Sequence, residues 1–111
     1  MRQDHKYLET NMARRKPVHP GEILKNDFLD ELNLTAYRLA KDLRIQKSRI
    51  SAIVNAKRAI SADTALRLSR YFGNSAEFWL NLQSDYDLEL IRRSTSKQIE
   101  REVRPLKECA A

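Results

Sequence analysis

A chain of 111 residues can bury one small hydrophobic core but not two ordinary ones, so a multidomain enzyme is excluded. Its 21 lysines and arginines outnumber its 15 aspartates and glutamates, which gives a formal net charge of +6. No apolar run approaches the about 18 residues of a membrane-spanning helix, and no apolar block of signal-peptide length opens the chain. We therefore expect a cytoplasmic protein that binds no membrane.

Turn-forming residues are rare, because the chain holds only two glycines and three prolines. Apolar and polar residues nowhere alternate strictly, and this pattern predicts an all-α fold of helices joined by short turns. The first residues show no helical period, and the last ones are highly charged. The predicted parts are a flexible N-terminal arm (1–18), a helical domain (19–92) and a charged C-terminal tail (93–111).

The first helix is predicted to begin at Pro20, because proline suits the first turn of a helix. Glu22 lies near the positive end of that helix, where an acidic residue is favourable. Apolar residues are predicted to form one face of this helix: Ile23, Leu24, Phe28, Leu29 and Leu32.

Two short helices are predicted next, separated by a turn at Arg44 and Ile45. Thr35 can cap the second helix, whose apolar residues recur at helical spacing: Ala36, Leu39, Ala40 and Leu43. The third helix (46–55) has a narrow apolar stripe formed by Ile50, Ile53 and Val54. Its other side is small, polar and basic, with Lys47 and Arg49 at the flanks and four residues facing outward: Ser48, Ser51, Ala52 and Asn55.

Serines are predicted to cap the last two helices. The fourth helix follows Ser61 and ends at Gly73, with four residues predicted to face inward: Ala65, Leu66, Ser69 and Phe72. The fifth helix follows Ser75 and carries Phe78, Trp79, Leu82 and Tyr86 on one side. Helical spacing favours core packing of these aromatic rings over a platform for stacking bases. Beyond Ser94 the chain forms a surface helix, a dimer contact or a frayed tail, and Pro105 limits how far a helix can extend.

The positive charge is concentrated in one segment. Residues 35–70 contain nine basic residues and two acidic ones, so this segment carries +7 while the rest of the chain carries −1. A basic stripe on a nearly neutral body is typical of a nucleic-acid binder. The alternative is a solvated basic face, and Arg67 and Arg70 in particular could be surface charges only.

The second and third helices together form the pattern of a helix-turn-helix, in which a short helix and a turn precede a helix that begins with small polar residues. Ala40 allows the two helices to cross closely, and Ile45 is expected to insert the turn into the core. Ile50 and Ile53 hold the third helix down, so that its start is free to enter the major groove of DNA.

The segment LAKDLRIQKSRISAIVNAKR resembles the Cro/C1-type (XRE) helix-turn-helix family. Further matches narrow the resemblance to the HigA antitoxins: HPGEIL at residues 19–24, NAKR at 55–58, ALRLS at 65–69 and SAEFWLNLQ at 75–83. The resemblance covers residues 12–92 and implies a five-helix, lambda-repressor-like domain.

Three positions depart from the pattern of this family. Arg44 stands in the turn where relatives usually have glycine, and Ala56 stands where glycine commonly follows the asparagine. Arg44 must therefore accept a positive φ or shift the turn, at a cost of about 1 kcal/mol. Gln46 replaces the usual serine or threonine, which predicts a weaker cap for the third helix.

Two groups of residues are candidates for DNA contact. Residues near the start of the third helix are candidates for contact with base edges: Lys47, Ser48, Arg49 and Ser51. A second group is better placed for phosphates, which fix register without reading sequence: Thr35, Arg38, Asn55, Lys57 and Arg58. A solvated helix face is the competing interpretation, most strongly for Ser51.

A single helix-turn-helix reads only a few base pairs, so we expect a homodimer on a palindromic double-stranded operator. The resemblance also implies an antitoxin that represses its own operon and neutralises a HigB-like toxin, a ribosome-dependent mRNA interferase. The hypothesis for toxin contact is the N-terminal arm together with an acidic face of the first helix, formed by Asp27, Asp30 and Glu31. The alternatives are a stand-alone phage-type repressor without a toxin partner, and an interaction module that has lost DNA binding.

Catalysis and metal binding have no support in the sequence. The acidic residues of the first helix have no nucleophile, phosphate loop or paired histidine beside them, so we expect no enzyme and no cofactor. His5, His19 and Cys109 match no common zinc spacing and are too few to hold a metal. With a single cysteine the chain forms no intrachain disulfide.

Overall fold

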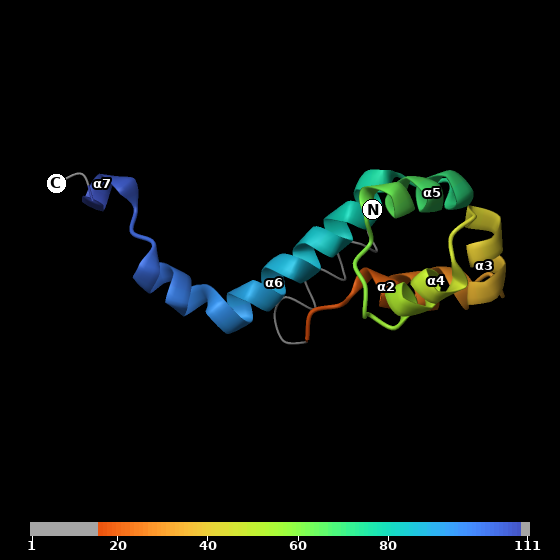
Figure 1. The fold of residues 1–111 in the computed structure, drawn as a ribbon, viewed down its shortest axis with the longest axis horizontal. Helices are drawn as coiled ribbons and strands as arrows, with labels where there is room; N and C mark the ends of the chain where they lie inside the picture. Colours follow the sequence, from red (N-terminus) through yellow and green to blue (C-terminus); the bar gives the residue numbers. More distant parts are fainter. Residues whose placement is uncertain (1–15, 110–111) are drawn as a thin grey trace.

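The computed structural model describes residues 16–109, and this part of the chain is helical with no strand. The first helical segment consists of α2 (Pro20–Ile23) and the π-helix η1 (Leu24–Leu29), which follow one another without a break. The helices after it are α3 (Ala36–Leu43), α4 (Lys47–Val54), α5 (Ala62–Phe72) and α6 (Ala76–Glu102), followed by the single turn α7 (Leu106–Cys109). The all-α, five-helix prediction is confirmed, with α2 and η1 together as the first helix. Figure 1 shows that α2 to α5 form a body from which α6 extends as a long helix that bends along its length.

The predicted helix caps are confirmed. Each of the three side-chain oxygens accepts a hydrogen bond from the backbone amide three residues later, at 3.0 Å for Thr35, 3.2 Å for Ser61 and 3.0 Å for Ser75. Gly73 follows α5 with φ 80°, the left-handed conformation that glycine adopts without strain. These signals fix where α3, α5 and α6 begin and where α5 ends.

The core is formed where the helices of the body meet. Trp79 of α6 is fully buried, and its ring centroid lies 5.0 Å from that of Phe28 in η1 and 5.0 Å from that of Phe78. Its indole nitrogen donates a hydrogen bond to the Asn74 side chain at 3.0 Å, so the buried polar atom is satisfied. Trp79 is therefore a core residue, as the sequence predicts. The other fully or almost fully buried apolar residues come from every helix of the body: Ile23, Leu24, Leu29, Leu39, Ala40, Leu43, Ile50, Ile53, Ile60, Ala65 and Leu68.

Two predictions about the inward faces are wrong. Leu32 is 56% exposed and Leu66 is 61% exposed. The π-helical turn, in which the amide of Asp30 donates to the Lys25 carbonyl at 2.9 Å, is wider than an α-turn and breaks the period that places Leu32 inward. In α5 the buried face is defined by Ala65 and Leu68, and Leu66 lies about 100° around the helix from Ala65.

The long helix α6 has one end in the core and one end outside it. Trp79 and Gln83 are buried near its start, whereas Leu88, Ile91 and Ile99 are exposed farther along. The helix passes residue 92 without interruption, so the predicted charged tail begins as part of the same helix. It ends at Glu102, shortly before Pro105, as the missing amide of proline leads one to expect.

Candidate nucleic-acid interface

The start of α4 projects from the body. Lys47 and Ser48 are exposed, and Arg49 and Ser51 are half-buried. The preceding Gln46 makes no side-chain cap, and only its backbone carbonyl binds the start of the helix, accepting from the Arg49 amide at 3.0 Å. The weaker cap predicted at this position is thus confirmed. Because Ile50 and Ile53 are fully buried on the other side, the accessible surface of α4 is small, polar and basic.

The turn between α3 and α4 is held by a left-handed arginine. Arg44 has φ 59° and ψ 46°, and its amide donates to the carbonyls of Ala40 and Lys41. The next amide, that of Ile45, donates to the Ala40 carbonyl at 3.0 Å, and the Ile45 side chain is half-buried. The chain therefore keeps the tight turn without glycine and accepts the positive φ that the sequence predicts for this position.

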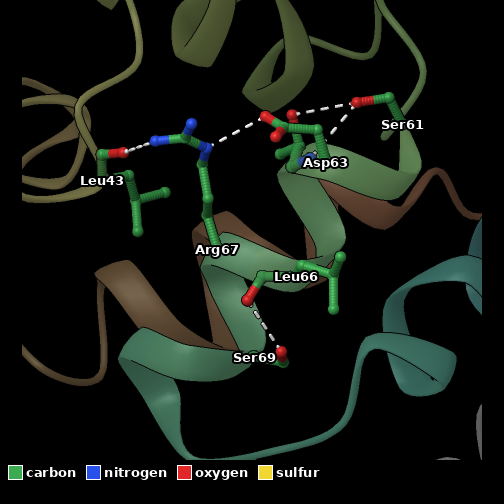
Figure 2. Close-up of polar contacts among 7 residues, drawn as sticks. Leu43, Ser61, Asp63, Leu66, Arg67 and Ser69 are labelled. Atoms are coloured by element: carbon green, nitrogen blue, oxygen red, sulfur yellow. Dashed lines mark hydrogen bonds and ion pairs between the residues drawn. The ribbon is translucent and has the colours of Figure 1, made fainter.

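Arg67 of α5 ties the end of α3 to the body. Figure 2 shows its guanidinium between two acceptors: Nη1 donates to the backbone carbonyl of Leu43 at 2.8 Å, and Nε donates to Asp63 at 2.9 Å. The Leu43 carbonyl lies in the last turn of α3, where carbonyls have no partner within the helix. Arg67 is therefore more than a surface charge, because it fixes the point from which the turn to α4 begins.

A second contact joins α5 to α3 through Asp42. The Tyr71 hydroxyl and the Arg38 Nε both donate to Asp42 Oδ2, at 2.5 Å and 2.7 Å. The Tyr71 hydrogen bond and then the Arg38 contacts lower the pKa of Asp42, and the same hydrogen bond raises the pKa of Tyr71. The pKa of Arg38 is raised by its hydrogen bond to Asp42. Of the predicted phosphate contacts on α3, Arg38 is thus exposed but already paired, and Thr35 uses its hydroxyl as a helix cap.

The loop after α4 carries the other predicted phosphate contacts, Asn55, Lys57 and Arg58, and all three are exposed. Its backbone is closely tied to the helix, because the Lys57 amide donates to the Ala52 carbonyl at 2.8 Å. Ala56 in the middle of the loop has φ 62°, as strained as Arg44. These bonds give residues 55–58 a fixed conformation beside the end of α4.

The segment that begins α2 packs directly against the end of α4. A Cβ placed on Gly21 would lie 1.8 Å from the backbone oxygen of Ile53, so only glycine permits this approach. The side chain of His19 is buried and accepts a hydrogen bond from the Gly21 amide at 2.8 Å. Burial lowers the pKa of His19. The residues that open the first helix therefore support the helix-turn-helix from the side of the core.

The three acidic residues predicted to meet a toxin lie on η1 and just after it. Asp30 and Glu31 are exposed, and Asp30 pairs with Lys25 at 3.0 Å. Asp27 is half-buried. Only Asp30 and Glu31 therefore present a substantial acidic surface, and most of the N-terminal arm predicted to act with them lies outside the described residues.

Other kinds of site are absent from the part of the chain that the structure describes. No group of three or more His, Cys, Asp or Glu side chains is placed to hold a metal ion in residues 16–109. His5 lies outside the described residues. No described helix has the length and apolar character needed to cross a membrane.

Four residues of the interface have roles that the sequence did not reveal: His19, Gly21, Arg67 and Tyr71. Asp63, Arg67 and Tyr71 recur at intervals of four, which places them on one face of a helix. The partners of Arg67 and Tyr71 on α3, however, lie 24 and 29 residues away in the sequence. His19 and Gly21 were recognisable only as part of the HPGEIL match, with no physical role attached.

Comparison with known proteins places this geometry among regulators and antitoxins. A helix-turn-helix family model matches residues 26–79. The solved structure of Pseudomonas aeruginosa antitoxin HigA with the higBA promoter superposes with a TM-score of 0.78 at 48% identity, covering 81% of this chain and 98% of that one. Virulence-associated protein I of Dichelobacter nodosus is 53% identical over 66% of this chain and 68% of its own length. Antitoxin HigA-1 of Vibrio cholerae is 36% identical over 68% of this chain and 71% of its own length.

Proposed function

The chain belongs to the helix-turn-helix family that includes the HigA antitoxins, a family of DNA-binding regulators and not of enzymes, and from this premise we propose that it is an autorepressing antitoxin. One observation carries the proposal. A HigA that is 48% identical over 98% of its length is solved with promoter DNA, and the corresponding fold here presents an exposed, basic start of α4.

The proposed DNA complex contains two copies of the chain on a palindromic operator, since one helix-turn-helix contacts too few base pairs for high affinity. In it, Lys47 and Ser48 contact base edges directly, and the half-buried Arg49 and Ser51 flank them. Asn55, Lys57 and Arg58 bind phosphates from the loop after α4. Exposure supports this division. Lys47 and Ser48 are exposed at the start of α4, and Asn55, Lys57 and Arg58 are exposed just after its end.

The proposed protein partner is a HigB-like mRNA interferase toxin, which the chain holds inactive. Support for this partner comes from the kinship with HigA antitoxins and from the separation of charge along the chain. A basic toxin would be attracted to the acidic surface of Asp30 and Glu31 and repelled by the DNA-binding surface.

Titration with the DNA upstream of its own coding sequence tests the DNA part of the proposal. Lys47→Ala should lower the preference for this duplex over a scrambled one, because it removes a base contact. Lys57→Ala should weaken binding to both duplexes by the same factor, because a phosphate contact does not read sequence. If the two variants change the two affinities in the same way, this assignment of contacts is wrong.

Co-expression tests the toxin part. We expect a small basic reading frame beside this gene to arrest growth when expressed alone and to be harmless together with this chain. Glu31→Lys should weaken that rescue, whereas Glu100→Lys, an exposed charge reversal far along α6, should not. Growth that is unaffected by the neighbouring frame would instead support a stand-alone repressor.

A further inference from the structure

A buried glutamine of α6 holds the backbone of the loop between α4 and α5. Gln83 is only 7% exposed, and its side-chain oxygen Oε1 accepts a hydrogen bond from the Ile60 amide at 2.8 Å. Its side-chain nitrogen Nε2 donates to Asp87 Oδ1, one helical turn farther along α6, at 3.0 Å. Because a backbone amide only donates, the oxygen of Gln83 must face the loop, and the bond to Asp87 holds the side chain in that orientation.

The loop is held at two points by two different helices. Up to Lys57 it is bound to α4, and the last of these bonds runs from the Lys57 amide to the Ala52 carbonyl at 2.8 Å. At Ile60 it is bound to α6 by the buried glutamine. Arg58 and Ala59, both exposed, lie between these two points. The backbone at Arg58 is therefore set from both sides, by α4 before it and by α6 after it.

The hydrogen bond adds direction to a position that burial already holds. The Ile60 side chain is buried and keeps this residue in the core. Apolar contacts are not directional, so they leave the preceding peptide group free to rotate. The bond to Gln83 is directional and fixes the plane of the peptide group that joins Ala59 to Ile60. That plane sets the direction in which the chain runs back to Arg58.

We propose that Gln83 is a positioning residue for DNA binding, which acts through the Ile60 amide and holds the Arg58 backbone so that the exposed guanidinium reaches a phosphate. This role rests on the proposed function, because it takes Arg58 as a phosphate contact. Gln83 itself is buried in the protein and touches no DNA. The neighbouring Lys57 does not depend on it, because the Lys57 amide is bound to α4.

Gln83→Met tests the role, because methionine keeps the length of the side chain but removes the acceptor for the Ile60 amide. We expect it to weaken binding about fivefold for the upstream duplex and for a scrambled duplex alike, since a phosphate contact does not read sequence. It should also reduce the slope of log affinity against log salt, by up to about 0.9 for each subunit bound, although it removes no charge. A purely structural role would leave this slope unchanged in the folded protein. Melting curves recorded in parallel ensure that affinities are compared between folded proteins.

Combined variants separate positioning from a general structural effect. Arg58→Gln should weaken binding about tenfold in the wild type but less than about twofold in Gln83→Met, because the phosphate contact is already lost there. Lys57→Gln is the matched control, since it removes a neighbouring charge whose backbone is held by α4. It should weaken binding by the same factor in both backgrounds.

Asp87→Ala is a milder variant that keeps the test valid if Gln83→Met does not fold. It removes the acceptor that orients the Gln83 amide but leaves the glutamine beside the Ile60 amide. Asp85→Ala is its control, because it removes an equal charge from an exposed site on the same part of α6. We expect Arg58→Gln to weaken binding about threefold in Asp87→Ala and about tenfold in Asp85→Ala.

Three outcomes would overturn the role of Gln83. They are an equal effect of Arg58→Gln with and without the glutamine contact, an unchanged salt slope in Gln83→Met, and a loss of the Lys57→Gln effect in that background, which would mean that the whole loop has loosened.

Failure of the proposed function looks different. A wild type without preference for its upstream DNA contradicts the proposed repressor, yet the coupling of Gln83 to Arg58 can still be measured on any duplex, because phosphate contacts do not depend on sequence. Wild-type affinity in Arg58→Gln contradicts the phosphate contact and with it the role of Gln83, while the preference for upstream DNA is measured separately. A wild type that binds no duplex at all contradicts both.

Discussion

Two residues other than glycine and asparagine adopt a left-handed conformation on either side of α4, Arg44 with φ 59° and Ala56 with φ 62°. Each of these turns therefore keeps its shape at the expense of strain. For residues with a Cβ this conformation costs about 1 kcal/mol. Backbone strain at both ends of α4, the helix that is proposed to enter DNA, therefore lowers the free energy of unfolding.

Ala56→Gly should raise the free energy of unfolding by about 0.5–1 kcal/mol, because glycine relieves the strain of the positive φ. Ala59→Gly is the matched control, an exposed alanine of the same loop that lacks a positive φ. It should lower stability slightly, because glycine makes the unfolded chain more flexible. Urea unfolding of both variants measures the difference, and a stabilisation of the same size in both would show that the φ of Ala56 carries no strain.

The two glycines of the chain are required for different reasons, and their substitution by alanine should show it. Gly21→Ala introduces a Cβ 1.8 Å from the Ile53 oxygen, so α2 and α4 must separate, and we expect a loss of about 3 kcal/mol or more. Gly73→Ala meets no atom within 4 Å and strains only its own backbone, at about 1 kcal/mol. Thermal and urea unfolding compare the two, and a Gly73→Ala variant as unstable as Gly21→Ala would contradict this account.

At the scale of elements, α5 acts as the support of α3. Its residues Arg67 and Tyr71 contact the last turns of α3, one through the Leu43 carbonyl and one through the Asp42 carboxylate. Since α3 packs against α4, the position of α4 depends on a helix that contributes no predicted base contact.

Arg67→Met should lower the free energy of unfolding by about 1 kcal/mol, because methionine keeps the apolar stem but leaves the Leu43 carbonyl without its donor. Arg70→Met removes a charge from the same helix at an exposed position and should change stability by less than about 0.5 kcal/mol. Urea unfolding of both variants compares their free energies of unfolding. Equal effects of the two substitutions would mean that the contact with Leu43 contributes nothing.

The helices and their caps were predictable because both depend on local sequence. The serine and threonine caps before α3, α5 and α6 are in place, and so is the glycine after α5. Leu32 was misplaced because a π-turn interrupts the α-helical period, and a sequence pattern assumes one constant period. The bond of Arg67 to the Leu43 carbonyl was out of reach, because its partner is the backbone carbonyl of a distant residue and every residue offers the same carbonyl.

At the scale of the whole molecule, the positive charge is segregated from the rest of the chain. Residues 35–70 carry +7 and the remainder carries −1, and within the basic segment Arg38 and Arg67 are paired with Asp42 and Asp63. The other basic residues of this segment include those at the start of α4 and in the loop just after its end. Electrostatic attraction to DNA should therefore come from a small part of the surface.

The salt dependence of DNA binding should report this segregation. Arg58→Gln should reduce the slope of log affinity against log salt by about 0.9 for each subunit bound, the effect of one phosphate contact. Arg101→Gln removes the same charge from the far part of α6 and should leave the slope unchanged. Titrations at several salt concentrations measure both slopes, and an equal reduction would show that the charge acts as a diffuse cloud and not through contacts.

Helix α6 also sets the distance between the helix-turn-helix body and its own C-terminal end. Its 27 residues form one uninterrupted helix that measures about 40 Å along its bent axis, is anchored in the core at Trp79 and is exposed at its far end (Figure 1). A partner that binds the far end of α6 is held at a fixed distance from α4 and at a fixed rotation about the helix axis. One residue inserted after Ser94 would rotate that end by about 100° about the helix axis. Seven inserted residues would return it to within about 20° of its original rotation and move it by about 10 Å along the axis. The length of α6 and its angular phase can therefore be varied separately.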